Sequence, residues 1–244
     1  MSATPRSTTV LNPLVFASVA GLFIFLWASG FVAAKYGLPY AEPFTLMAAR
    51  FVVGAAILVP ACFVLKASWP RTIRETTHIL VAGFGVQTVY LIGVYYGIWL
   101  GISTGVTALV VGLQPLLTGV MAGFVLREQV TPRNWIGLVL GFIGLGLVVW
   151  DRVLAPTDTL WGLVTLLIGL AGITLGTLYQ KKYCGPFDVR AGVALQNITS
   201  CIVMLVLAMT FESMIIDWTE EFVFAVLWSA IGLSVFAICL YYWL

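Results

Sequence analysis

Charged side chains are scarce in this sequence. Its 244 residues include only 12 Lys or Arg and 10 Asp or Glu, whereas 61% of them are hydrophobic. A soluble globular domain has about 25% charged and about 45–50% apolar residues, so this chain has too few charges to cover a water-facing surface of its own size. The composition excludes a soluble enzyme domain, a disordered regulator and a basic nucleic-acid-binding protein. It predicts an integral membrane protein.

Residues that commonly carry catalysis or bind metals are equally few. His78 is the single histidine, and the four cysteines stand apart without metal-ligand spacing: Cys62, Cys184, Cys201 and Cys239. Hydrolysis and group transfer need a nucleophile with a base, or a metal. We therefore expect no enzymatic activity, no cofactor and no metal, and we interpret His78 as a solvated residue at the edge of a span.

Long apolar runs are what the sequence does contain. A helix needs about 20 residues to cross about 30 Å of hydrocarbon, and a backbone in lipid must satisfy its own hydrogen bonds, so each run is expected to be a transmembrane helix. The fifth run is short and can be extended by Asn134. The expected spans are residues 14–34, 44–65, 79–100, 104–126, 135–150, 160–179, 191–209 and 222–244.

The short connections between these runs carry most of the charge. With a cytoplasmic N-terminus, nine Lys or Arg residues lie on the inner side, and only Lys35 and Arg152 lie on the outer side. Short loops follow the positive-inside rule. We therefore expect a multi-pass protein of the bacterial inner membrane with a cytoplasmic N-terminus, whose first run is retained as a helix rather than cleaved as a signal.

The sequence also contains signs of an internal duplication. The pair Pro43-Phe44 recurs as Pro186-Phe187, and the pair Tyr95-Tyr96 recurs as Tyr241-Tyr242. The first copy has five spans, an odd number, so the second copy is expected to lie upside down in the bilayer, as in many secondary transporters.

The two copies are expected to differ in length. Residues 1–152 hold five spans and residues 153–244 hold three, without counterparts of spans four and five. The predicted fold is an all-α membrane protein with an inverted repeat of five plus five helices, here with eight helices because the last two of the second repeat are absent. We expect a truncated or split version of a ten-span protein; a complete eight-span protein is the alternative.

Two stretches of the chain resemble a known family. One runs from Trp27 to Lys35 (WASGFVAAK) and continues with Pro43 and Arg50-Phe51; the other is Glu128 followed by Gly137 and Gly144. They resemble the EamA family of the drug/metabolite transporter superfamily, above all its aromatic and neutral amino-acid exporters of the YddG type. The resemblance implies both termini in the cytoplasm, a central cavity ringed by spans one to four and six to nine, and a small-molecule substrate. A monomer is compatible with such a protein in the lipid bilayer.

Polar and aromatic side chains at membrane depth are the best pointers to a site. On the third span, Gln87 and Tyr90 are three residues apart and share a face, and Tyr95 and Trp99 are four apart on the adjacent face. One amide, two phenols and an indole can hold an amphipathic solute, so these four are candidate substrate-binding residues. Interhelical hydrogen bonding with an aromatic belt is the alternative.

Further substrate-binding candidates lie on other spans. Gln196 and Asn197 form an amide pair on the seventh span and point about 100° apart, while Gln114 lies in the middle of the fourth. Trp27 on the first span and Trp161 at the start of the sixth complete the set. Trp at a helix end is also typical of an interfacial anchor.

Two residues have an electrostatic or mechanical interpretation. Arg50 lies seven residues past Pro43, about 10 Å into the bilayer. There it can pair with a substrate carboxylate. In a structural role it can instead snorkel to the outer surface or bind Glu42 and helix carbonyls. Pro115 cannot donate to the carbonyl of Val111, which predicts a gating hinge or a static kink.

Small residues repeat on the fourth and fifth spans. Gly105, Gly112 and Gly119 recur every seven residues, and Gly137 and Gly141 are four apart. Small residues let membrane helices approach closely, so we expect helix packing at both stripes. A sliding surface for alternating access is the alternative.

The middle of every span lacks Asp and Glu. A proton-coupled exporter of organic cations needs a buried carboxylate for which proton and substrate compete. We therefore expect export of small neutral or zwitterionic amphipathic metabolites, such as aromatic or other neutral amino acids, by alternating access. A same-fold transporter for another cargo, such as a drug or a nucleotide sugar, is the alternative.

Overall fold

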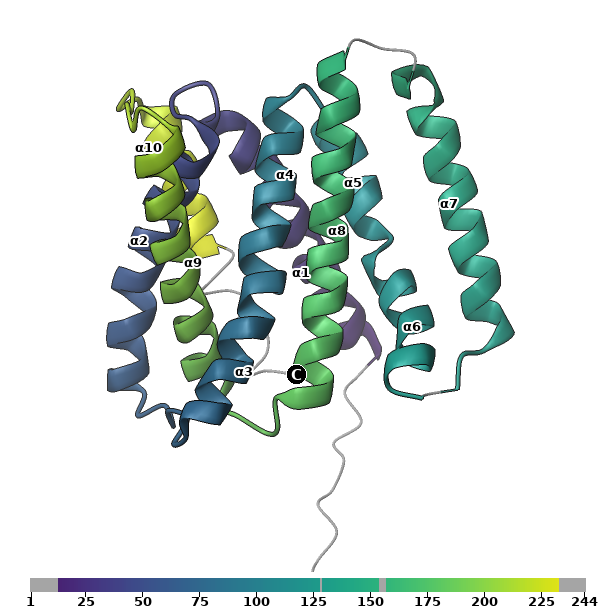
Figure 1. The fold of residues 1–244 in the computed structure, drawn as a ribbon, viewed down its shortest axis with the longest axis horizontal. Helices are drawn as coiled ribbons and strands as arrows, with labels where there is room; N and C mark the ends of the chain where they lie inside the picture. Colours follow the sequence, from purple (N-terminus) through teal and green to yellow (C-terminus); the bar gives the residue numbers. More distant parts are fainter. Residues whose placement is uncertain (1–12, 128, 154–156, 233–244) are drawn as a thin grey trace, which may run out of the picture.

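Helical segments make up most of the described chain. The computed structural model describes residues 13–127, 129–153 and 157–232 (Figure 1). Its α-helices are α1 (Pro13–Gly37), α2 (Pro43–Val64), α3 (Ile73–Gly83), α4 (Tyr90–Trp99), α5 (Thr104–Gly112), α6 (Gln114–Val125), α7 (Pro132–Val153), α8 (Thr157–Tyr183), α9 (Val189–Phe211) and α10 (Glu220–Leu227). Two π-helical segments are η1 (Phe84–Val89) and η2 (Trp228–Gly232).

These segments form eight rods. The helices α3, η1 and α4 continue into one another, as do α5 with α6 and α10 with η2 (Figure 1). Within the described ranges, β pairing is limited to an isolated bridge between Ala41 and Ile216. The predicted all-α membrane fold is therefore confirmed.

The rods follow the predicted spans. Within the residues that the structure describes, five stretches are long and apolar enough to cross a bilayer: Pro43–Val64, Ile73–Trp99, Thr104–Val125, Leu160–Tyr183 and Val189–Phe211. The fifth expected span is longer than residues 135–150, because α7 has 22 residues, begins at Pro132 and so includes Asn134 as the predicted extension. Proline suits the first position of a helix, where its missing N–H has no partner to lose. Residues 233–244 of the eighth expected span lie outside the described residues, as do Glu128, Cys239, Tyr241 and Tyr242.

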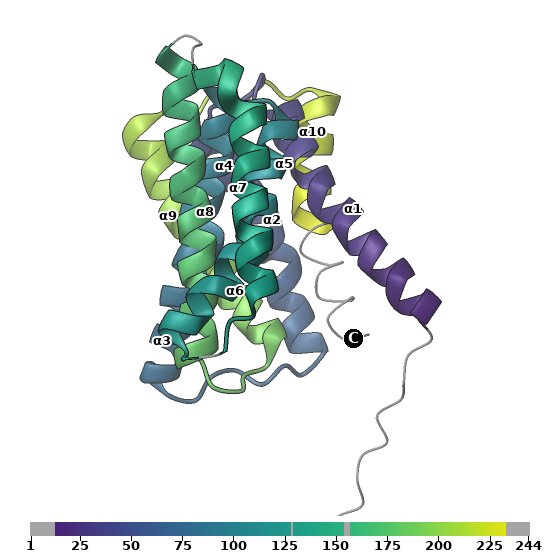
Figure 2. The ribbon, with the colours of Figure 1, turned by 90° about the vertical axis from the view of Figure 1, so that its right-hand side faces the viewer.

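We call the end of the bundle with the loops after α2, α6 and α8 the inner end, because the sequence predicts these positively charged connections on the cytoplasmic side. The opposite end is called the outer end. The helix α7 stands at the edge of the bundle and packs on α5, α6 and α8, while α1 is inclined to the other helices (Figures 1 and 2).

The helices α4 and α8 touch through their backbones. A Cβ added at Gly93 would lie 2.4 Å from the carbonyl oxygen of Thr165, and one added at Gly169 would lie 2.9 Å from the carbonyl oxygen of Tyr90. Gly85 of η1 is as close to the backbone of α8. A side chain has no room at these contacts, so glycine is what permits the approach.

The expected glycine packing on the fourth span is wrong in part. A Cβ added at Gly105 or Gly112 would meet no heavy atom within 4 Å, and one at Gly119 would meet only an Asn side chain, at 3.7 Å. On the fifth span, Gly141 and Gly137 do pack, with leucine side chains 2.8 Å and 3.4 Å from an added Cβ. A spacing along one helix shows which residues share a face, but not which face meets a neighbour.

The helices α2 and α9 are joined at both ends by reciprocal hydrogen bonds. At the outer end, the Glu42 carboxylate before α2 accepts from the backbone N–H and hydroxyl of Ser213, at 2.8 Å and 2.7 Å. At the inner end, the Asp188 carboxylate before α9 accepts from the backbone N–H of Ser68, at 2.9 Å. Glu42 precedes α2 and binds the segment after α9, while Asp188 precedes α9 and binds the segment after α2. The two sets of contacts are therefore equivalent when the two helices are exchanged.

Two further features have the same symmetry. The third rod of each half packs on the first rod of the other half, namely α3, η1 and α4 on α8, and α10 and η2 on α1. Each of these third rods also contains a π-helical segment. These pairings are consistent with the predicted inverted repeat.

Candidate functional site

Four of the predicted residues gather on α1, α2 and α4. The Arg50 guanidinium donates a hydrogen bond to the Tyr95 hydroxyl, at 3.3 Å. The Trp27 ring stacks on the Tyr90 ring, with centroids 6.3 Å apart and an interplanar angle of 22°. Tyr90 also lies within electrostatic reach of Arg50 and Tyr95. We call these four residues the Arg50 cluster.

The Arg50 cluster combines one cation with aromatic surface. Tyr90 and Tyr95 are buried, Arg50 is half-buried and Trp27 is 38% exposed. Among the described residues, the guanidinium has a single hydrogen-bond partner, the Tyr95 hydroxyl. The structural partner considered from the sequence, Glu42, binds Ser213 instead. A guanidinium has several N–H donors in a planar fork, so the geometry leaves donors for an anionic group.

Gln87 and Tyr90 contact different helices. Gln87 lies in η1, and its amide donates to Gln196 of α9 at 3.4 Å, whereas Tyr90 begins α4 and stacks on Trp27 of α1. The shared face expected from an α-helical spacing is not formed, because a π-turn holds an extra residue and rotates the rest of the rod about its axis. Gln87 is therefore outside the Arg50 cluster.

The amide pair of α9 also divides between two interfaces. Gln196 is buried, and its amide nitrogen donates to Gln180 of α8 at 3.2 Å. Asn197 faces α2, where an added Cβ at Gly54 would lie 2.8 Å from its amide nitrogen. The two side chains thus point toward different helices, as expected for neighbouring residues whose directions differ by about 100° on a helix. For Gln87, the contact is the interhelical hydrogen bond of the alternative interpretation, and Gln196 is its acceptor.

The other two candidate tryptophans lie on the surface. Trp99 is 51% exposed at the outer end of α4, and Trp161 is 59% exposed near the outer end of α8. Trp99 meets the Tyr96 ring edge-on, at 5.7 Å. Large amphipathic rings at helix ends fit the interfacial-anchor interpretation.

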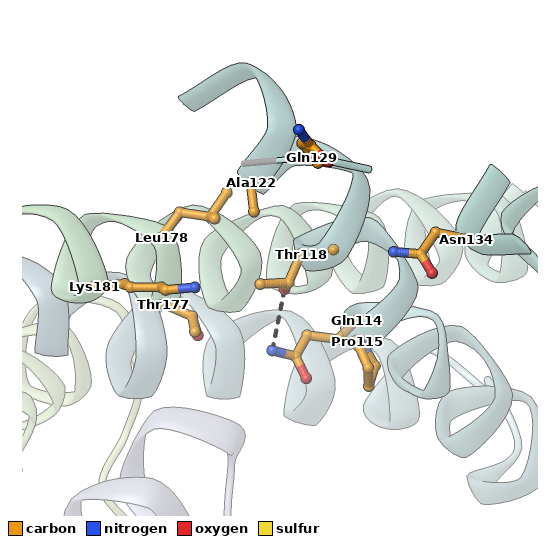
Figure 3. A pocket seen from close by; sticks show the side chains of 10 residues that line it. Gln114, Pro115, Thr118, Ala122, Gln129, Asn134, Thr177, Leu178 and Lys181 are labelled. Atoms are coloured by element: carbon orange, nitrogen blue, oxygen red, sulfur yellow. Dashed lines mark hydrogen bonds between the residues drawn. The ribbon is translucent and has the colours of Figure 1, made fainter. Parts of the chain in front are cut away.

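The fourth rod is interrupted beside Pro115. Leu113 separates α5 from α6, and Pro115 stands in the first turn of α6. A pocket of about 410 Å³ opens next to this break, between α6, α7 and α8. Gln114 lines it and donates to the Thr118 hydroxyl at 3.4 Å (Figure 3). Gln114 and Pro115 thus belong to a place separate from the Arg50 cluster.

Sequence reasoning missed the role of Glu212. Its carboxylate follows α9 and accepts hydrogen bonds from the backbone N–H groups of Phe44 and Thr45, from the Thr45 hydroxyl and from the Tyr96 hydroxyl. It therefore caps the N-terminus of α2 from a distant part of the chain. Since capping motifs are recognised by local spacing, the sequence carries no signal for this contact.

His78 is also placed differently from the prediction. It is half-buried rather than fully solvated, and its Nδ1 lies 2.8 Å from the Tyr179 hydroxyl. Its ring stacks on Tyr183 at 5.7 Å. The aromatic partners come from the last turns of α8, which the sequence alone does not bring to the start of α3.

The loop acids next to α2 and α9 are held in their ionised form. Hydrogen bonds from the Arg190 side chain keep the pKa of Asp188 well below its usual range, with the backbone N–H of Ser68 acting in the same direction. The Ser213 hydroxyl and backbone N–H lower the pKa of Glu42. Both ends of the α2–α9 pair thus carry a carboxylate stabilised as the anion.

Comparison with known proteins agrees with this architecture. Residues 14–150 match the model of the EamA-like transporter family. A solved crystal structure has the same fold, with a TM-score of 0.66 and 16% sequence identity, over 94% of this chain and 80% of that one.

Similar curated proteins are named as transporters. The uncharacterized transporter YvbV of Bacillus subtilis is 27% identical over 98% of this chain and 74% of its own length. The uncharacterized inner membrane transporter YedA of Escherichia coli is 23% identical over 82% of this chain and 63% of its own length. A probable amino-acid metabolite efflux pump of Salmonella typhimurium is 26% identical over 67% of this chain and 52% of its own length.

Proposed function

The chain belongs to the EamA-like transporter family, and we propose that it exports small neutral or zwitterionic amphipathic metabolites, amino acids in particular, by alternating access. The proposal places it in the bacterial inner membrane with a cytoplasmic N-terminus. A relative named as a probable amino-acid metabolite efflux pump supports this class of substrate.

The Arg50 cluster is the observation that carries the proposal. A guanidinium at membrane depth with one hydrogen bond to the described residues is suited to a carboxylate, which it can bind in a bidentate manner. The Trp27 and Tyr90 rings beside it supply apolar surface for a side chain. A carboxylate next to an apolar side chain is the common feature of neutral amino acids.

Transport in proteoliposomes tests this function. L-phenylalanine is the probe, and phenethylamine, which lacks the carboxylate, is its matched control. We expect Arg50→Gln to lower phenylalanine transport by about tenfold or more, because losing one partner of a desolvated charge pair costs about 2–5 kcal/mol. Arg50→Lys should retain part of the activity, since it keeps the charge but not the planar fork.

The control variant is Arg71→Gln, which removes an exposed cation from the loop after α2. It should transport phenylalanine like the wild type. Equal transport by Arg50→Gln and Arg71→Gln would contradict the proposed role of Arg50. Transport of phenethylamine in preference to phenylalanine would point to another cargo of the same fold.

A further inference from the structure

Two buried aromatic residues contact the Arg50 guanidinium. The guanidinium donates a hydrogen bond to the Tyr95 hydroxyl of α4 at 3.3 Å, and it lies over the ring of Phe51 of α2, 5.6 Å from the ring centroid. Tyr95 is 2% exposed and Phe51 is 1% exposed. An arginine side chain has many rotamers, and each of these contacts excludes some of them. The guanidinium is therefore held from two helices at once.

Without such contacts, an arginine at this depth can turn toward the outer surface. Arg50 stands seven residues past Pro43, the first residue of α2, and a long basic side chain can snorkel from there to the water. Two acids, Glu42 and Glu212, lie at the same end of α2. A salt bridge with either acid would take the cation away from a substrate at membrane depth. The position of Arg50 therefore depends on partners that hold it at that depth.

Both outer acids are engaged by other donors. Glu42 accepts from the backbone N–H and the hydroxyl of Ser213, at 2.8 Å and 2.7 Å. Glu212 accepts from two backbone N–H groups in the first turn of α2, at 2.8 Å and 2.7 Å. These hydrogen bonds satisfy much of the acceptor capacity of the two carboxylates. They favour the conformation in which Arg50 points to the Tyr95 hydroxyl instead.

The turn of α4 that carries Tyr95 is itself attached to α2. The next residue, Tyr96, donates to the Glu212 carboxylate at 3.3 Å, and its ring centroid lies 4.8 Å from that of Phe44. Because Glu212 caps the first turn of α2, this contact joins α4 to the outer start of α2. Adjacent tyrosines thus connect the two helices at two depths, and the outer contact helps to keep Tyr95 within reach of Arg50.

We propose that Tyr95 is a positioning residue, which holds the Arg50 guanidinium at membrane depth for the substrate carboxylate and does not itself bind the substrate. The inference rests on the proposed export function. A hydroxyl that accepts from one N–H group orients the planar fork and leaves its other donors for a carboxylate. Burial supports this division of roles, since Tyr95 is 2% exposed, whereas Trp27 is 38% exposed and can contact a solute.

Binding of L-phenylalanine to the purified chain in nanodiscs of phosphatidylcholine tests the role of the hydroxyl. Tyr95→Phe removes the hydroxyl and keeps the ring, so the packing of α4 is preserved. We expect the Kd to rise by about fivefold, a loss typical of one hydrogen bond. The matched control is Tyr36→Phe, because that ring is 54% exposed on α1. It should leave the Kd within about twofold of the wild type.

A double-mutant cycle separates positioning from direct binding. If Tyr95 acts through Arg50, adding Tyr95→Phe to an Arg50→Gln protein should leave the Kd within about twofold. A hydroxyl that binds the substrate itself would raise the Kd by the same factor in both backgrounds. A second variant, Tyr96→Phe, releases the outer contact of α4 and should raise the Kd by about two- to threefold, again only when Arg50 is present.

Chemical modification tests the position of Arg50 without a substrate. The chain in nanodiscs is treated with p-hydroxyphenylglyoxal, a polar reagent that modifies arginine, and peptide mass spectrometry measures the rate of reaction at Arg50. Tyr95→Phe should raise this rate by about fivefold, because the side chain then reaches the outer surface more often. The rate at Arg71, an exposed arginine, should be the same in every variant. An unchanged rate at Arg50 in Tyr95→Phe would overturn the proposal.

The failures of the two proposals are distinguishable. Equal phenylalanine transport by Arg50→Gln and Arg71→Gln would contradict the proposed role of Arg50 in export, whatever the reagent measures. Equal Kd values for Tyr95→Phe and Tyr36→Phe, or the same rise of the Kd with and without Arg50, would remove the positioning role and leave the Arg50 transport result unchanged.

Discussion

Asp188 is a single side chain that contributes to the stability of the fold at the start of α9. Its carboxylate accepts hydrogen bonds from the backbone N–H of Ser68 and from the backbone and guanidinium of Arg190. We expect Asp188→Ala to lower the free energy of unfolding by about 2 kcal/mol, because it removes an N-cap and a charged hydrogen bond. Thermal unfolding in detergent measures this loss. Asp217→Ala is the control, since that exposed side chain has no hydrogen bond to the described residues, and it should unfold like the wild type.

The same carboxylate links stability to pH. Because its pKa is lower in the folded than in the unfolded chain, the folded state binds fewer protons. The stability that the ionised Asp188 contributes is complete above the pKa of an unfolded Asp, about 3.9, and is lost as the pH falls below that value. Between about pH 6 and about pH 3, the wild type should therefore lose more stability than Asp188→Ala. Parallel losses in the two proteins would show that Asp188 does not carry this dependence.

At the scale of the element, the contact between α4 and α8 depends on glycine. Gly93→Ala would place a methyl group 2.4 Å from the carbonyl oxygen of Thr165, a backbone atom that cannot move aside. We expect the free energy of unfolding in detergent to fall by about 2–3 kcal/mol. The matched control, Gly105→Ala, adds its methyl group in open space and should be neutral or stabilising by up to about 1 kcal/mol, as alanine favours helix. Similar losses in both variants would contradict the backbone contact.

The positions of the helices along the sequence were predictable because a backbone in lipid must satisfy its own hydrogen bonds. An apolar run that cannot bond to water must form a helix, so hydropathy alone located α2, α8 and α9 to within a few residues. The contact faces of those helices were not predictable in the same way. Gly93 and Gly97 are four residues apart, and Gly105 and Gly112 are seven apart. Nevertheless, a Cβ at Gly93 would meet a backbone, whereas one at Gly105 would meet open space.

The candidate site was predictable in part, for a related reason. Residue type and depth identified Arg50, Tyr90 and Tyr95, and the structure brings them together with Trp27. The π-helical segment η1 then directs Gln87 toward α9, because it alters the turn that an α-helical spacing assumes. Tertiary contacts such as the capping of α2 by Glu212 join residues far apart in sequence, which local patterns do not reveal.

At the scale of the whole molecule, the two halves meet along α2 and α9. Glu42 binds Ser213 at the outer end while Asp188 binds Ser68 at the inner end, and both contacts are closed in the same structure. A transporter that opened by separating these helices would have one of the two ends open. The pair is therefore expected to behave as a rigid centre, around which the other rods move during alternating access.

Cross-linking tests whether the α2–α9 pair moves. In a chain whose native cysteines are replaced by alanine, Glu42→Cys with Ser213→Cys reports on the outer end, and Ser68→Cys with Asp188→Cys reports on the inner end. We expect a short, reducible bis-thiol reagent at either end to leave phenylalanine transport within about twofold of the untreated protein, because a rigid pair has no motion to lose. The matched control is the same protein treated with a monofunctional reagent, which modifies the thiols without joining them. Transport that stops on cross-linking and returns on reduction would show that the joined end must open, and the moving boundary of the molecule would then lie between α2 and α9.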